Sequence, residues 1–141
     1  MIVGFNLTKV KVERKKPLQG KITVNHDLRL DDVRKMPLPL KEKQEALVFD
    51  FTFMVMYEPG VGEAIIGGNV LYYADPKKID SVYSQWTKSK KLPSDVSLEI
   101  INMIMAKCSV KTLELAHDLN LPSHLPLPQI RLQEDPSTYI G

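Results

Sequence analysis

Cysteine and histidine are scarce in this sequence of 141 residues, which contains one cysteine and three histidines. A single thiol excludes an internal disulfide and a metal site built from cysteines. His26, His117 and His124 do not recur at the spacing by which one face of a helix binds a metal ion. These scarcities predict a chain without a metal or cofactor, in which Cys108 is a small buried apolar residue.

Long apolar runs are lacking as well. No stretch approaches the roughly 18 apolar residues of a membrane-spanning helix, and the N-terminus lacks the basic, apolar and small-residue order of a signal peptide. We therefore expect a cytoplasmic protein without membrane insertion. The hydrophobic content of 43% and the charged content of 26% are typical of a globular protein. One domain is expected over residues 1–132, followed by a flexible tail over residues 133–141.

The motifs of common enzymes are missing. Gly60, Gly62, Gly67 and Gly68 lie close together, but no Lys-Ser or Lys-Thr pair follows them. The third glycine of the dinucleotide fingerprint is also absent, and the chain has no Gly-x-Ser-x-Gly motif. The sequence therefore predicts a protein that is not an enzyme.

The basic residues do not form the cluster that a nucleic acid requires. The formal net charge is +2, and the lysines near the N-terminus have acidic neighbours such as Glu13, Asp27 and Asp31. Phosphate binding needs a concentrated positive field. We expect a solvated charged surface and no nucleic-acid partner.

Residues 45–74 predict a β-hairpin whose two arms are apolar on both faces. Side chains alternate between the two faces of a strand. In a sheet with one solvent-exposed face, apolar and polar residues therefore alternate along the sequence. The second face of this hairpin is therefore expected to meet another subunit or an apolar ligand. The first arm places on its two faces, respectively, Leu47, Phe49, Phe51, Phe53, Val55 and Tyr57, and Ala46, Val48, Met54 and Met56.

Two more strands are predicted before the hairpin, over residues 2–14 and 22–30. The apolar positions change parity between Leu7 and Val10, which predicts a bulge in the first strand. Gly67 and Gly68, inside the second arm of the hairpin, predict a bulge or a close backbone approach.

A long connection is predicted over residues 31–43. It contains the sequence Met36-Pro37-Leu38-Pro39-Leu40. Proline fixes its own φ and favours extended geometry in the residue before it. We expect this segment to lie over a surface, with its three large apolar side chains forming one wall of a groove.

Two helices complete the chain. Asp75 and Pro76 are suited to begin the first helix, and the second is predicted from residues 93–95 to residue 119. Strands followed by helices indicate an α+β fold with helices on one sheet face. The apolar stripe predicted for the second helix consists of Leu98, Ile101, Met105, Cys108, Leu115 and Leu119, and it is widened by Ile100, Met103, Ile104 and Val110.

The order of these elements resembles the SecB family of protein-export chaperones over about residues 5–132. The residues that carry the resemblance are the strand segment 24–30, the hairpin, the long helix over 97–119 and the proline-bearing stretch over 125–130. The resemblance implies a four-stranded antiparallel sheet in Greek-key order 1-4-3-2, followed by two helices. It also implies a cytoplasmic homotetramer, built as a dimer of dimers without a cofactor.

The resemblance further implies an ATP-independent holdase that binds unfolded or precursor polypeptides. The groove of this family lies between the crossover from strand two to strand three, the sheet and the last helix. Two alternatives remain open: a dedicated chaperone or adaptor for one partner such as an antitoxin, and a carrier of a small apolar ligand. By position, the implied groove consists of Met36, Leu38, Leu40, His26, Leu28, Leu30, Ile101, Ile104 and Met105.

Overall fold

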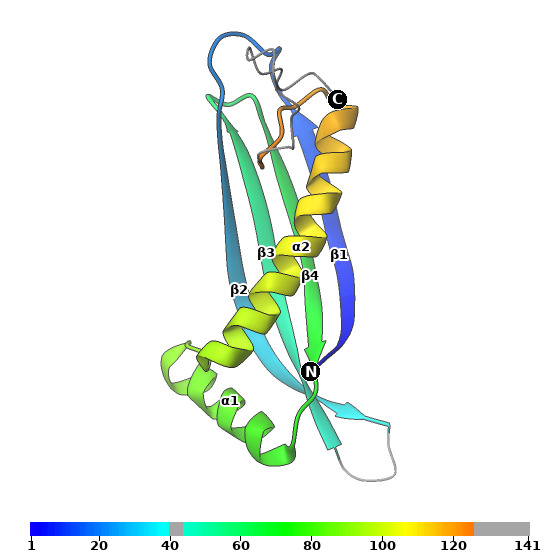
Figure 1. The fold of residues 1–141 in the computed structure, drawn as a ribbon, viewed down its shortest axis with the longest axis vertical. Helices are drawn as coiled ribbons and strands as arrows, with labels where there is room; N and C mark the ends of the chain where they lie inside the picture. The colour runs from blue at the N-terminus through cyan, green and yellow to red at the C-terminus, as the bar shows by residue number, and fades with distance from the viewer. Residues whose placement is uncertain (40–43, 126–141) are drawn as a thin grey trace, which may run out of the picture.

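The structure, a computed structural model, describes residues 1–39 and 44–125. The strands are β1 (Ile2–Arg14), β2 (Thr23–Leu38), β3 (Gln44–Glu58) and β4 (Gly62–Tyr72), and the helices α1 (Pro76–Ser89) and α2 (Ser94–Asp118) follow them (Figure 1). The strands form one antiparallel sheet in the order β1-β4-β3-β2. The predicted α+β class, strand order and helix positions are confirmed.

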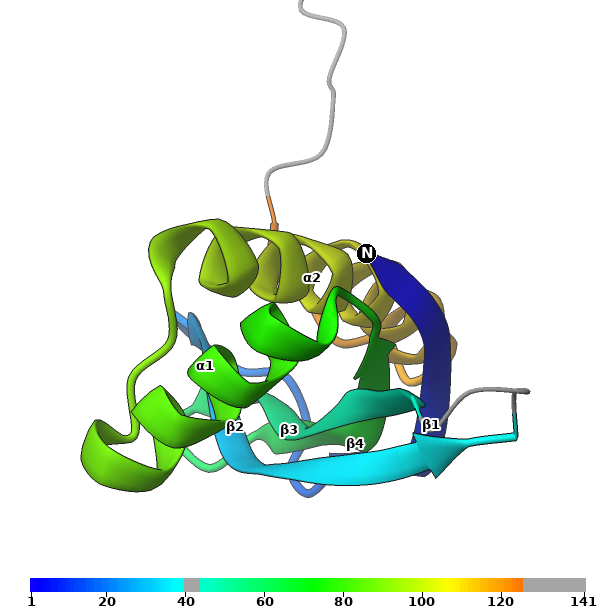
Figure 2. The same cartoon turned by 90° about the horizontal axis from the view of Figure 1, so that it is seen from below.

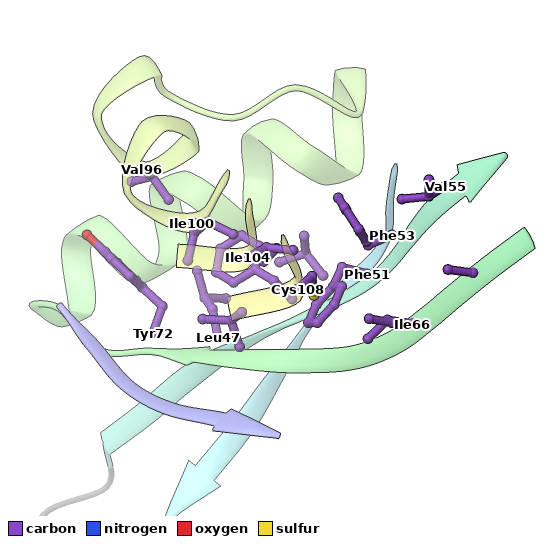
Figure 3. Close-up of a cluster of buried hydrophobic side chains, with 14 of the residues drawn as sticks. Leu47, Phe51, Phe53, Val55, Ile66, Tyr72, Val96, Ile100, Ile104 and Cys108 are labelled. Atoms are coloured by element: carbon purple, nitrogen blue, oxygen red, sulfur yellow. The ribbon is translucent and has the colours of Figure 1, made fainter. Parts of the chain in front are cut away.

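Both helices cover the same face of the sheet (Figures 1 and 2). Helix α1 contacts β2 and β3, whereas α2 crosses over β4 and β1. The core lies between the helices and alternate residues of the two central strands, and it includes Phe51 of β3, Ile66 of β4, and Ile100 and Ile104 of α2 (Figure 3). In the described part of the chain, no helix is both long and apolar enough to cross a membrane.

The predicted bulge in β1 lies opposite the glycine pair of β4. Leu7 pairs with Gly68 and Lys9 with Gly67, and the register shifts between these two pairs. A Cβ atom at Gly68 would overlap the backbone carbonyl oxygen of Asn6. The close backbone approach predicted from the sequence is therefore confirmed, and it requires a residue without a side chain.

The connection predicted to begin at residue 31 is wrong, because β2 continues to Leu38. Met36 pairs with Ala46 and Pro37 with Glu45, so this segment belongs to the β2–β3 ladder. Proline is tolerated here because β2 is an edge strand, in which one side of the backbone has no strand to pair with. Leu40 lies outside the described residues.

The bounds predicted for α2 are confirmed, and the predicted apolar stripe is right only in part, because Ile100 and Ile104 are buried but Val110 is exposed. Leu98 is 62% exposed, whereas Cys108 is buried as expected. The helix carries large apolar residues on several sides, so the periodicity alone does not decide which side packs on the sheet. The residues of α2 that are buried are Val96, Ile100, Ile104, Cys108, Ser109, Thr112 and Ala116.

The second face of the sheet carries no helix in the described part of the chain. Apolar pairs lie on it, as predicted: Met54 is opposite Ile65, and Val48 is opposite Leu71. Val48 is already buried within the chain, whereas Met54, Ile65 and Leu71 are half-buried, and their contact with another subunit or an apolar ligand stays a prediction.

Polar pairs cross the same face between β2 and β3. Arg34 donates two hydrogen bonds to Asp50, at 2.9 and 3.0 Å. Asp31 accepts hydrogen bonds from Thr52 at 2.6 Å and from Arg29 at 2.7 Å. Partial burial acts to raise the pKa of Asp31, but these two bonds outweigh it and the pKa lies below its usual value. Asp31 and Asp50 are therefore each paired with an arginine.

Candidate functional site

A bulge in β2 decides which of the predicted site residues share a surface. Leu28 pairs with Phe53 and Leu30 with Phe51, and both phenylalanines are buried beneath the helices. The register then shifts by one residue between Leu30 and Asp32. Because side chains alternate with period two, this shift moves every later side chain of β2 to the opposite face.

Beyond the bulge, the two faces of β2 are exchanged. Val33 pairs with Phe49 and is buried on the helix face. Met36 pairs with Ala46, and it lies with Leu38 on the helix-free face. The structure thus brings His26, Leu28 and Leu30 together, and it separates Met36 and Leu38 from them.

On the helix face, an open pocket of about 520 Å³ lies at the edge of the sheet. One wall comes from β2, and the others come from the end of α1, the turn after it and the start of α2. Trp86 is buried and the three leucines are half-buried, whereas Lys90 and Lys91 are exposed. The lining residues are Leu28, Arg29, Leu30, Trp86, Lys90, Lys91, Leu92 and Ser97.

The predicted residues of α2 extend this surface along the helix. Ile101 and Met105 follow Ser97 at intervals of four residues, which places all three on one side of α2. Ile101 and Met105 are half-buried, and Met105 packs against the core. Ile104 is fully buried, so it supports the surface from below and is not accessible to a ligand.

The far end of this surface is occupied by the chain itself. After α2, the segment 121–125 returns toward the sheet, and its N–H at Leu121 donates to the Ala116 carbonyl at 2.8 Å. The His124 ring lies between His26 and Phe53, with a centroid distance of 6.0 Å to each. The predicted site residue His26 therefore contacts a part of the chain that the sequence did not connect to it.

His124 is only 9% exposed, and neither of its ring nitrogens has a hydrogen-bond partner among the described residues. Burial lowers the pKa of His124, and repulsion from His26 lowers it further. The neutral imidazole is therefore the form that fits this position.

A second pocket, of about 290 Å³, contains the other predicted residue of β2. Leu38 lines it together with Val3, Pro39 and Tyr73. The Tyr73 hydroxyl donates to Gln44 Oε1 at 2.8 Å, which turns the polar atom of the ring toward β3. This pocket presents an apolar surface that is separate from the pocket on the helix face.

The described residues offer little for covalent or metal chemistry. Among them, no group of three or more histidine, cysteine or acidic side chains is placed to hold a metal ion. Burial raises the pKa of the Cys108 thiol to about 11, so the thiolate is not formed near neutral pH. The arrangement is suited to reversible contact with apolar side chains.

Several residues of the helix-face pocket were missed by the sequence analysis. In the sequence, Trp86 looks like one of the apolar residues by which α1 packs on the core. Lys90 and Lys91 look like the basic residues that commonly follow the C-terminus of a helix. Nothing in the sequence indicates that the end of α1 turns toward Leu28 and Leu30. The one sequence signal for this part of the pocket is that lysines stand close to a tryptophan at the end of a helix.

Sequence comparison finds no relative: no model of a protein family matches the chain, and no curated protein matches it. Among solved structures, the chain is similar to Rv1957, a SecB-like chaperone of Mycobacterium tuberculosis, solved in complex with a ChAD peptide from the antitoxin HigA1 (Rv1956). The TM-score is 0.58 at 13% identity, over 93% of this chain and 89% of that one. The chain therefore has a SecB-like fold, as the resemblance in its sequence implies.

Proposed function

We propose that this protein is an ATP-independent chaperone, a holdase that binds unfolded or precursor polypeptides. The observation that carries the proposal is the open pocket at the edge of a SecB-like sheet, in which Leu28, Leu30, Trp86 and Leu92 stand beside basic residues. An unfolded chain exposes apolar side chains, and such a pocket removes them from water.

The energy of client binding comes from many small contacts. Each square ångström of apolar surface that leaves water contributes roughly 25 cal/mol. The edge strand β2 adds backbone groups with which an extended client can pair. Affinity of this kind depends on apolar content and flexibility rather than on one sequence motif.

The proposed client surface consists of two parts. The first contains His26, Leu28 and Leu30 of β2 with Ile101 and Met105 of α2, above the buried Ile104. The second contains Met36 and Leu38 on the helix-free face. A long client crosses from one part to the other around the edge of β2.

The proposal includes self-association into a homotetramer, built as a dimer of dimers. Its support is β1, an edge strand that exposes Val3, Leu7 and Val10. Exposed apolar side chains and unpaired backbone groups on one edge favour pairing with another chain. Size-exclusion chromatography with light scattering is expected to give four times the mass of one chain.

The proposal also treats residues 1–132 as one folding unit that works in the cytoplasm. It involves no chemical step, no cofactor and no nucleic acid.

Aggregation of a chemically unfolded client, followed by light scattering without nucleotide, tests the proposal. Suppression that saturates near one assembly per client is the expected result. A folded preparation that does not suppress aggregation at any ratio would contradict the holdase function.

A dedicated chaperone for one partner is the second candidate. The observation that favours it is the antitoxin peptide bound to the structurally similar mycobacterial protein. This candidate predicts capture of one partner by affinity purification, together with indifference to generic unfolded clients. The two candidates are therefore distinguished by the same light-scattering assay.

A further inference from the structure

The rim of the helix-face pocket carries an excess of positive charge. Lys90 and Lys91 line the pocket, and Lys90 Nζ lies 5.4 Å from the centroid of the Trp86 ring. Arg29 also borders the pocket, but it pairs with Thr52 of β3, and its guanidinium is held on the helix-free face by Asp31, whose Oδ1 lies 2.7 Å from Arg29 Nε. Within residues 1–39 and 44–125, no acidic residue lines the pocket.

Two other lysines near the helices, one at the start of α1 and one on β2, are paired with carboxylates. Lys78 lies 2.6 Å from Asp95, and Lys35 lies 2.6 Å from Asp80. Among the described residues, neither Lys90 nor Lys91 has a carboxylate within ion-pair distance.

The negative end of the α1 dipole neutralises only part of the positive charge of these lysines. A helix C-terminus carries about half a negative charge, and Lys88 already stands in the last turn of α1. Lys90 is the C-cap residue, and Lys91 lies beyond the helix. The two lysines therefore remain available to an anionic group that enters the pocket beside an apolar one.

We propose that this pocket selects client segments in which a large apolar side chain stands next to acidic residues. The inference rests on the proposed function, because it names the class of polypeptide that the client surface prefers. The apolar side chain packs among Leu28, Leu30 and Trp86, and the neighbouring carboxylates pair with Lys90 and Lys91. A segment flanked by basic residues meets the same apolar contacts but is repelled at the rim.

Fluorescence anisotropy with two labelled peptides tests the inference on the full-length protein. The peptides share one leucine- and phenylalanine-rich sequence, and they differ in carrying glutamate or lysine at the same flanking positions. The glutamate peptide is expected to bind about fivefold more tightly at low salt, which corresponds to two exposed ion pairs. The difference should shrink as salt is added, because exposed charges are screened.

A charge-reversed variant locates the effect. Lys90→Glu combined with Lys91→Glu should abolish or invert the preference. The matched control combines Lys16→Glu with Lys21→Glu, which makes the same change in net charge at two exposed positions between β1 and β2 and should keep the preference. Lys91→Glu alone, outside the helix, should reduce the preference in a protein whose α1 is unaltered.

The outcomes distinguish the charge preference of the pocket from the holdase function itself. Equal binding of the two peptides, or a preference that the pocket variant leaves unchanged, overturns the inference and leaves the holdase function intact. Failure of both peptides to bind, together with failure to suppress aggregation, overturns the proposed function and the inference with it.

Discussion

The rings of His26 and His124 meet edge to face, with their centroids 6.0 Å apart. This contact joins the edge strand β2 to the segment that follows α2. His124 is buried and also meets Phe53, so the pair holds segment 121–125 over the end of the proposed client surface.

Acid should weaken this contact. The pKa of His124 lies below its usual value because of burial and, secondly, because of repulsion from His26. The unfolded chain therefore binds a proton before the folded chain does, and the free energy of unfolding falls as the pH drops from about 6.5 through the lowered pKa. Urea unfolding from about pH 7.5 to about pH 5.5 measures this loss. His124→Gln, which cannot titrate, should lose less over the same range; parallel curves would contradict the prediction.

Leu28→Ser combined with Leu30→Ser should weaken client capture without changing the strand order. Each leucine is half-buried and loses part of its apolar contact with a client, so the expected cost is about 1–2 kcal/mol, or about 5- to 30-fold in affinity. Light scattering with an unfolded client measures the change. Leu98→Ser is the matched control, because Leu98 is exposed and lies outside the pocket.

Leu38→Ser separates the two parts of the proposed client surface. Leu38 lies in the pocket with Val3 and Tyr73, on the face opposite Leu28. If clients use both parts, the variant should reduce capture of long clients and leave the binding of short peptides at the helix-face pocket unchanged. Unchanged capture of long clients would remove Met36 and Leu38 from the client surface.

Gly68→Ala should destabilise the sheet by about 1–3 kcal/mol, since the added methyl group overlaps the Asn6 carbonyl oxygen and forces β1 and β4 apart. Gly67→Ala is the control, because its Cβ would lie 3.5 Å from the Lys9 Cβ, an ordinary contact. Its unfolding free energy should stay within about 0.5 kcal/mol of the parent. Equal effects of the two substitutions would contradict the predicted close approach.

Cys108 should be unreactive in the folded protein. It is fully buried, and its pKa is raised to about 11. A chromogenic disulfide reagent near neutral pH should modify it only after urea is added. Val110→Cys, at an exposed position of the same helix, should react at once in the folded variant. Rapid modification of the parent protein would show that α2 opens readily from the sheet.

Elements that depend on local patterns were predictable from the sequence. The parity change between Leu7 and Val10 predicted the bulge in β1, and the apolar run around Phe51 predicted the first arm of the hairpin. The limits of α2 followed from the residues near 94 and 120. Each of these features is determined by neighbours along the chain, so a pattern in the sequence is sufficient to detect it.

Features that depend on tertiary packing were not predictable. The face of α2 that packs on the sheet is chosen by the shape of the core, which buries Ile100 and Ile104 and leaves Leu98 exposed. The contact between His26 and His124 depends on the return of the chain after α2. The separation of Leu38 from Leu28 depends on one extra residue in β2, for which Asp31 gave no local signal.

That extra residue has a consequence for how distant relatives are aligned. If an alignment places the one-residue gap elsewhere in β2 than at Asp31, the residues between the two positions are assigned to the wrong face of the sheet. This happens even if the residue types match well. At 13% identity such gaps are not fixed by sequence. Substitution patterns before and after Asp31 should therefore be compared as two separate blocks, anchored on Phe53 and Phe49 of the neighbouring strand.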